Sequence, residues 1–137
     1  MTDRFLLDTC AVLWLVEGTP LSRDANVALS RGREKRSLFV SSMSAWEIGI
    51  LISKGRLPTT KDAMSWFQDA VDMIGAQTAD VSLHALVVSS FLPRPVHNDP
   101  ADRILIATAR ENDLTIITRD RAILSYGAAG HVRTLAC

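Results

Sequence analysis

The sequence predicts a single α/β domain with a mainly parallel sheet, on three observations. Short apolar runs alternate along the chain with amphipathic segments of helical period. The length suits one domain, so residues 1–137 are expected to form one unit. Strands that alternate with helices are joined by right-handed crossovers, which produce parallel sheets covered by helices on both faces.

The composition, 47% hydrophobic and 22% charged, is typical of a globular protein. The apolar run near the N-terminus is broken by Asp8, is shorter than the roughly 20 residues of a membrane span, and lacks signal-peptide features. We therefore expect a cytoplasmic protein. Two distant cysteines, Cys10 and Cys137, predict neither a disulfide framework nor a zinc site. The zero net charge argues against a polybasic coat for nucleic acid.

The first part of the chain predicts two buried strands with a helix between them. Residues 4–7 and 37–42 are short apolar runs bounded by polar residues, as in buried parallel strands. The helix is expected over residues 22–32, because Ser22 suits an N-cap and Gly32 a terminator.

Three helices are then expected in succession, over residues 44–55, 60–75 and 82–91. The second is the clearest, with Thr60 as its cap and Gly75 as its end. Its apolar residues recur at helical spacing and predict a face that packs on the core. They are Ala63, Trp66, Phe67, Ala70, Val71 and Ile74.

The next helix, over residues 99–112, has Asp99 as its expected N-cap and Pro100 at its first position, where a missing N–H costs nothing. The β-branched run at 114–118 predicts a central strand. The remaining expected elements are a helix at 119–126, stopped by Gly127, and a strand at 132–136.

Five acidic residues are expected at one edge of this sheet. Asp8 follows the first strand, Glu47 lies in the first turn of the helix after the second, Asp99 and Asp102 open a helix, and Asp120 closely follows a strand. In a parallel sheet, the carboxyl ends of the strands and the N-termini of the following helices share one edge. Four or five carboxylates should therefore converge there.

Each acid also has a purely structural interpretation. The alternatives are a capping box of Ser44 with Glu47, N-caps at Asp99 and Asp120, and a favourable helix-dipole position at Asp102. Asp8 fits this interpretation least, because it ends a buried strand. Crowded carboxylates raise one another's pKa, so the whole set predicts a cation between them.

Hard divalent cations suit these ligands, because Mg²⁺ and Mn²⁺ prefer oxygen donors, whereas a zinc set of Cys and His is lacking. One or two ions would activate a water for attack on a phosphodiester, so His97 is not needed as a general base. The expected ligands are Asp8, Asp102 and Asp120, with Glu47 through water and Asp99 as a further candidate. Thr9 and Thr118 could orient neighbouring acids by hydrogen bonds.

Four motifs follow one another over nearly the whole chain: LLDTCAVLWL, SAWEIGI, HNDPADRILIATA and TIITRD. Together they resemble the PIN-domain family, and more narrowly the VapC-type toxins of bacterial and archaeal toxin–antitoxin pairs. Asp8, Glu47, Asp102 and Asp120 match the family's acidic quartet by position, and Asp99 matches an additional acid of one branch.

The resemblance implies a three-layer α/β/α sandwich and a Mg²⁺- or Mn²⁺-dependent endoribonuclease. It also implies a homodimer, and inhibition by a small antitoxin encoded next to it, whose C-terminal segment can put an Arg into the acidic site. That branch usually has His at the position of Cys10 and Phe at the position of Ala101, so the floor of the pocket differs here.

Two other functions remain open from the sequence. An Asp at the end of the first strand also suits aspartyl-phosphate chemistry, although a D-x-D enzyme needs an acid at position 10, where Cys stands. Acids that serve only as helix caps would suit a non-catalytic binding module. Metal binding separates these functions, because Mn²⁺ at 100 times its dissociation constant stabilises a protein by about 2.7 kcal/mol.

Overall fold

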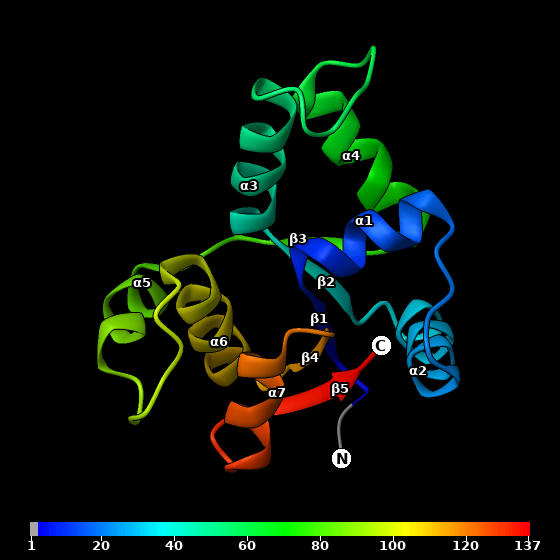
Figure 1. The fold of residues 1–137 in the computed structure, drawn as a ribbon. Helices are drawn as coiled ribbons and strands as arrows, with labels where there is room; N and C mark the ends of the chain where they lie inside the picture. The colour runs from blue at the N-terminus through cyan, green and yellow to red at the C-terminus, as the bar shows by residue number, and fades with distance from the viewer. Residues whose placement is uncertain (1–2) are drawn as a thin grey trace.

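A computed structural model describes residues 3–137 and shows a five-stranded sheet between helices (Figure 1). The strands lie in the order β3-β2-β1-β4-β5, and every neighbouring pair is parallel. Their bounds are β1 Phe5–Leu7, β2 Leu38–Ser41, β3 Gln77–Ala79, β4 Thr115–Thr118 and β5 Arg133–Ala136. The predicted α/β class with a parallel sheet is confirmed.

Helices cover both faces of this sheet. The elements are α1 Thr9–Glu17, α2 Arg23–Glu34, α3 Ser42–Ser53, α4 Ala63–Ile74, α5 Leu83–Val88, the short 3₁₀ helix η1 Ser89–Phe91, α6 Pro100–Asn112 and α7 Arg121–Ala128. Buried residues of α1, α2, α3 and α4 share one core cluster, and those of α5, α6 and α7 share the other. This is the expected three-layer arrangement. Among residues 3–137 no helix is long and apolar enough to cross a membrane.

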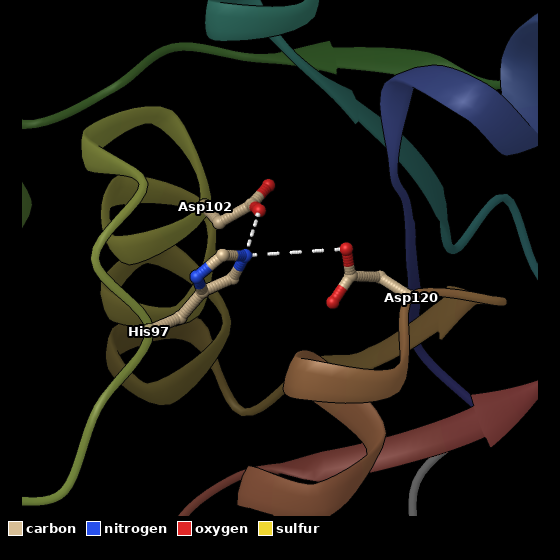
Figure 2. Close-up of side chains that lie close together, drawn as sticks. All are labelled: His97, Asp102 and Asp120. Carbon is tan, nitrogen blue, oxygen red and sulfur yellow. Dashed lines mark ion pairs between the residues drawn. The ribbon is translucent and has the colours of Figure 1, made fainter.

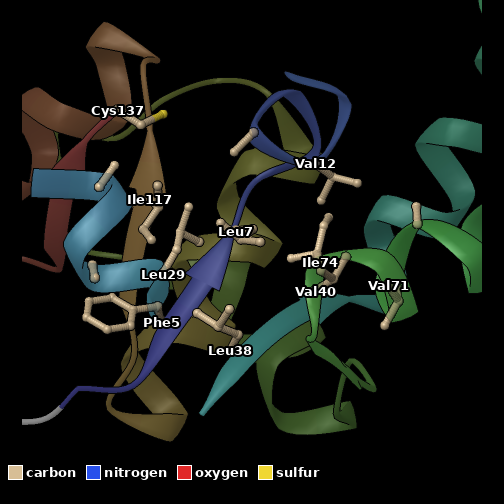
Figure 3. Packing of buried hydrophobic residues seen from close by; sticks show 14 of the residues in the cluster. Phe5, Leu7, Val12, Leu29, Leu38, Val40, Val71, Ile74, Ile117 and Cys137 are labelled. Carbon is tan, nitrogen blue, oxygen red and sulfur yellow. The ribbon is translucent and has the colours of Figure 1, made fainter. Parts of the chain in front are cut away.

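The two cores follow from the alternation of side chains along β1. Phe5 and Leu7 belong to the first cluster, which Figure 3 shows from close by, whereas Leu6 between them belongs to the second. Ile117 and Ile116 of β4 alternate in the same way. Because both faces of the sheet are buried at β1, this strand is apolar throughout, which is why a short apolar run predicted it.

Most helix starts agree with the prediction, since Ser22, Ser82, Asp99 and Asp120 all cap helices through their side chains. Helix α4 is an exception: its cap is Asp62 and not Thr60, because the Asp62 carboxylate accepts the Ser65 N–H at 2.9 Å.

Two glycines predicted to end helices lie inside them instead, in α2 and α7. A Cβ added at Gly32 would lie 2.3 Å from Leu38 Cδ2, and one added at Gly127 would lie 2.5 Å from Thr134 Oγ1. These positions therefore need glycine for close packing against strands, and both helices continue past them.

Two elements have no counterpart in the prediction. Helix α1 follows β1 directly, and the uninterrupted apolar run of residues 11–16 conceals its helical period. Strand β3 has only three residues at the edge of the sheet, with Gln77 and Thr78 exposed, so it has no apolar signal.

The strand order places a switch point beside β1. From β1 the chain builds β2 and β3 outward on one side, then returns to add β4 and β5 on the other side of β1. In open parallel sheets, a crevice forms at such a point, outside the carboxyl ends of the strands. The residues that follow β1 and β4 therefore face a common crevice.

Candidate active site

Asp8 lies at the end of β1 and is buried, with 8% of the residue exposed. It caps α1, since its Oδ1 accepts the Ala11 N–H at 2.7 Å, while its Oδ2 accepts the Thr118 hydroxyl at 2.5 Å. Burial raises the pKa of this carboxyl most, against the lowering effect of the two hydrogen bonds, and the charges of Asp120 and Glu47 raise it further. A buried carboxylate is thus held in one orientation at the crevice.

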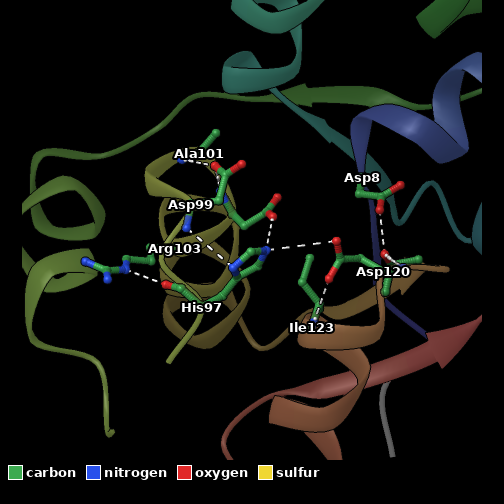
Figure 4. Close-up of polar contacts among 9 residues, drawn as sticks. Asp8, His97, Asp99, Ala101, Arg103, Asp120 and Ile123 are labelled. Atoms are coloured by element: carbon green, nitrogen blue, oxygen red, sulfur yellow. Dashed lines mark hydrogen bonds and ion pairs between the residues drawn. The ribbon is translucent and has the colours of Figure 1, made fainter. Parts of the chain in front are cut away.

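Thr118, the last residue of β4, connects two of the acids. Its hydroxyl donates to Asp8 and accepts the backbone N–H of Asp120 at 3.0 Å. Asp120 in turn caps α7, with its Oδ1 accepting the Ile123 N–H at 3.0 Å (Figure 4). A single hydroxyl therefore fixes the relative position of the residues that follow β1 and β4.

Glu47 is held from α1. Thr9 Oγ1 donates to Glu47 Oε1 at 2.7 Å and lies 2.8 Å from Ser44 Oγ. Because the Thr9 hydroxyl has one proton, Ser44 is the donor in the second contact.

The predicted capping box of Ser44 and Glu47 is wrong, as is the placing of Glu47 in the first turn of its helix. Ser41 caps α3 by accepting the Met43 N–H at 3.0 Å, so the helix starts earlier and Glu47 lies in its second turn. There its carboxylate is turned toward Thr9 and is not used as a cap.

Asp99 and Asp102 have different environments, although only two residues separate them. Asp99 Oδ1 accepts the N–H groups of Ala101 at 2.9 Å and Asp102 at 3.3 Å, so this carboxylate caps α6. The Asp102 side chain projects from the first turn toward the crevice and is 23% exposed.

His97, considered from the sequence and set aside as a general base, contacts this part of the site. Its Nε2 lies 2.9 Å from Asp102 Oδ2 and 4.0 Å from Asp120 Oδ2 (Figure 2). One ligand atom from each of the three residues lies within 4.8 Å of the others, so the imidazole belongs to the same cluster as two acids of the quartet. The sequence signal for this contact was the position of His97, five residues before Asp102. The contact itself depends on the fold, which turns the loop of His97 back onto α6.

The electrostatics show that these acids share one neighbourhood. The pKa of Asp102 is raised to about 7, first by burial and then by the charges of Asp99, Asp120 and Glu47, while His97 lowers it. The pKa of the neighbouring Cys10 thiol is also raised, by burial and then by the charges of the quartet, Asp8, Glu47, Asp102 and Asp120. Negative charge is therefore in excess, and a divalent cation bound by carboxylate oxygens would offset it.

Ala101, where the related branch usually has Phe, lines an apolar pocket of about 320 Å³. Trp46 and Met43 of α3 form the opposite wall. The Trp46 residue is 61% exposed and so is not part of the core. Trp46 is followed in the chain by Glu47, and Ala101 is followed by Asp102. Both of these acids belong to the quartet, so the pocket adjoins the acidic site.

Comparisons of the sequence with known proteins found a matching family model and a relative. A family model described as PIN domain matches residues 5–128. The chain is 30% identical over 126 residues to Ribonuclease VapC22 of Mycobacterium tuberculosis (strain ATCC 25618 / H37Rv), an alignment that covers 92% of this chain and 93% of that protein.

Solved structures are similar in fold. One is VapBC2 from Rickettsia felis bound to a DNA fragment from their promoter, with a TM-score of 0.69, 15% identity and 96% and 97% of the two chains covered. Another is DNA-bound VapBC from Salmonella typhimurium, with a TM-score of 0.71, 12% identity and 97% of both chains covered. At these identities the likeness concerns the fold.

Proposed function

The chain belongs to the PIN-domain family, in its VapC-type branch, and from this membership and the acidic site we propose that it is a divalent-metal-dependent endoribonuclease. One observation supports the proposal above the others. The quartet of Asp8, Glu47, Asp102 and Asp120 comes from four separate parts of the chain to the switch point of the sheet. Burial raises the pKa values of Asp8 and Asp102, and the charges of neighbouring carboxylates raise them further.

In this proposal Asp8, Asp102 and Asp120 hold one or two Mg²⁺ or Mn²⁺ ions, with Glu47 acting through water. When bound there, such a cation supplies Lewis acidity: it lowers the pKa of water and stabilises charge on phosphodiester oxygens. The role of Thr118 and Thr9 is to keep Asp8 and Glu47 oriented before the ion arrives, through the hydrogen bonds described above. Asp99 supports Asp102 as the cap of α6.

The proposed partner is a small antitoxin encoded next to this protein. The proteins similar in fold include VapBC complexes, and the relative VapC22 is named a ribonuclease. An acidic crevice with unbalanced negative charge suits a cationic side chain as well as a metal ion, which fits inhibition by an Arg of the antitoxin. We also propose that the protein acts as a homodimer in the cytoplasm, where its RNA substrate lies.

A phosphoryl-acceptor role for Asp8 is disfavoured by the residue two positions after it. A D-x-D enzyme needs an acid at position 10, where this chain has Cys10.

The test is cleavage of a long RNA by purified protein with Mg²⁺ or Mn²⁺, with EDTA, and with the Asp102→Asn variant. We expect discrete cleavage products with either metal ion, and none with EDTA or in the variant. The matched control is Asp62→Asn, the same change at the exposed cap of α4, which should cleave at the wild-type rate. Cleavage that survives both EDTA and Asp102→Asn would refute the proposal.

A further inference from the structure

His97 contacts the proposed metal site without belonging to the acidic quartet. We propose that His97 is a positioning residue, which orients the Asp102 carboxylate by donating its Nε2–H and leaves the binding of the cation to oxygen atoms alone. This inference rests on the proposed function, because it concerns the same site. The contact that carries it is the 2.9 Å distance between His97 Nε2 and Asp102 Oδ2.

The tautomer of the imidazole follows from its second contact. The backbone N–H of Asp99 points at His97 Nδ1, at a distance of 3.4 Å, so Nδ1 is an acceptor (Figure 4). In a neutral imidazole one nitrogen accepts and the other carries the proton, which places the proton on Nε2. A protonated ring nitrogen has no lone pair for a metal ion, but it can donate to Asp102.

The loop around His97 is attached to the same end of α6 as Asp102. Arg103 Nε donates to the His97 carbonyl oxygen at 2.5 Å, and Arg103 Nη2 donates to Asn98 Oδ1 at 3.3 Å. The imidazole and the Asp102 carboxylate therefore belong to one hydrogen-bonded unit. Asp120 precedes α7 as its cap, and its Oδ2, 4.0 Å from His97 Nε2, lies beyond hydrogen-bonding distance.

This arrangement has a consequence for the choice of metal. Asp102 Oδ2 accepts from His97, so Asp102 Oδ1 is left for the cation, in an orientation that the imidazole restricts. The ligands are then all oxygen atoms, which favours hard ions such as Mg²⁺ and Mn²⁺ over Zn²⁺. Loss of a partner that orients a metal ligand typically lowers metal affinity about 10- to 100-fold.

The first experiment uses the metal-free protein in EDTA at pH 8. A long-range ¹H–¹⁵N NMR spectrum of the histidine rings reports which nitrogen carries the proton. We expect Nε2 of His97 to be protonated, and a bare Nε2 would overturn the inference. Because it needs neither metal nor RNA, this measurement is independent of whether the protein is a nuclease.

The second experiment measures Mn²⁺ binding by calorimetry, with pulsed EPR on the Mn²⁺-loaded protein. His97→Ala should bind Mn²⁺ about 10- to 100-fold more weakly than wild type. His97→Gln should recover most of this loss, because the Gln amide N–H can reach the same carboxylate. The control is His84→Ala, at an exposed position of α5, which should bind Mn²⁺ like wild type. The EPR spectrum should show no ¹⁴N coupling from a bound imidazole.

Three results would overturn the inference: wild-type affinity in His97→Ala, no recovery in a folded His97→Gln, or ¹⁴N coupling that His97→Gln abolishes. If His97→Ala does not fold, the comparison of His97→Gln with wild type and the EPR spectrum still decide. A wild-type protein that cleaves RNA with Mn²⁺ while one of these results holds refutes the role of His97 and leaves the proposed function intact. A wild-type protein that binds no Mn²⁺ refutes both.

Discussion

Asp102→Asn should make the metal-free protein more stable at pH 8, although it removes a proposed metal ligand. The pKa of Asp102 rises from 3.8 to about 7 in the folded protein, which at roughly 1.4 kcal/mol per unit corresponds to about 4 kcal/mol. Since 23% of the side chain is exposed to water, which screens the repulsion, we expect a gain of about 2 kcal/mol. For a domain of this size that raises the melting temperature by about 8 °C.

The sign follows from proton binding. The unfolded chain releases the Asp102 proton near pH 3.8 and the folded protein near pH 7, so between these values the folded state holds more protons. The free energy of unfolding of the wild type therefore falls as the pH rises from about 4 to 7. Asp102→Asn has no carboxyl proton to release at this position, so its free energy of unfolding does not fall for this reason. The difference between the two proteins should be larger at pH 8 than at pH 5.

The assay is thermal unfolding by calorimetry in EDTA at both pH values, and then with Mn²⁺. Mn²⁺ at 100 times its dissociation constant should stabilise wild type by about 2.7 kcal/mol and Asp102→Asn by much less. Asp62→Asn is the matched control: Asn and Asp cap helices about equally well, so it should show no gain at pH 8 and a wild-type Mn²⁺ shift. The reasoning is refuted if Asp102→Asn is no more stable than wild type at pH 8 in EDTA.

Three further outcomes are expected. Gly32→Ala should destabilise the protein by about 1–3 kcal/mol in urea unfolding, because the added Cβ meets Leu38. Gly49→Ala, also inside a helix but with nothing within 4 Å of the added Cβ, should instead stabilise it by up to about 1 kcal/mol; equal effects would contradict the packing. Thr118→Val should destabilise the protein by about 1–3 kcal/mol in the same assay, because the buried Asp8 carboxylate loses a hydrogen-bond donor. Thr118→Ser should recover most of this loss. A Thr118→Val variant as stable as wild type would show that the hydrogen bond is unimportant. Mn²⁺ should speed the alkylation of Cys10 by iodoacetamide, because it offsets the carboxylate charges that, together with burial, raise the pKa of the thiol. Peptide mass spectrometry measures the rate, and an unchanged rate would place the ion away from Cys10.

The convergence of the acids could be predicted because it depends on topology alone. Asp8 and Asp120 follow parallel strands, and Asp102 lies in the first turn of a helix, so all three belong at the same edge of the sheet. The helix caps at Asp99 and Asp120 were also predictable, since a cap involves residues within one turn.

The partners of these acids could not be predicted in the same way. The pattern of Ser44 and Glu47 satisfies the local rule for a capping box, yet Ser41 caps the helix and Thr9 reaches Glu47 from another element. Likewise, Gly32 has the form of a helix stop, but the close approach of β2 gives it a packing role.

By itself, the sequence determined the α/β class, most strands and helices, and the set of acids at one edge, because periodicity, capping and the order of elements depend on residues close together along the chain. Only the tertiary structure decided which side chains meet, such as Thr118 with Asp8 and His97 with Asp102. Such contacts depend on angles and distances between packed elements, and a difference of one or two ångströms there decides whether a hydrogen bond forms.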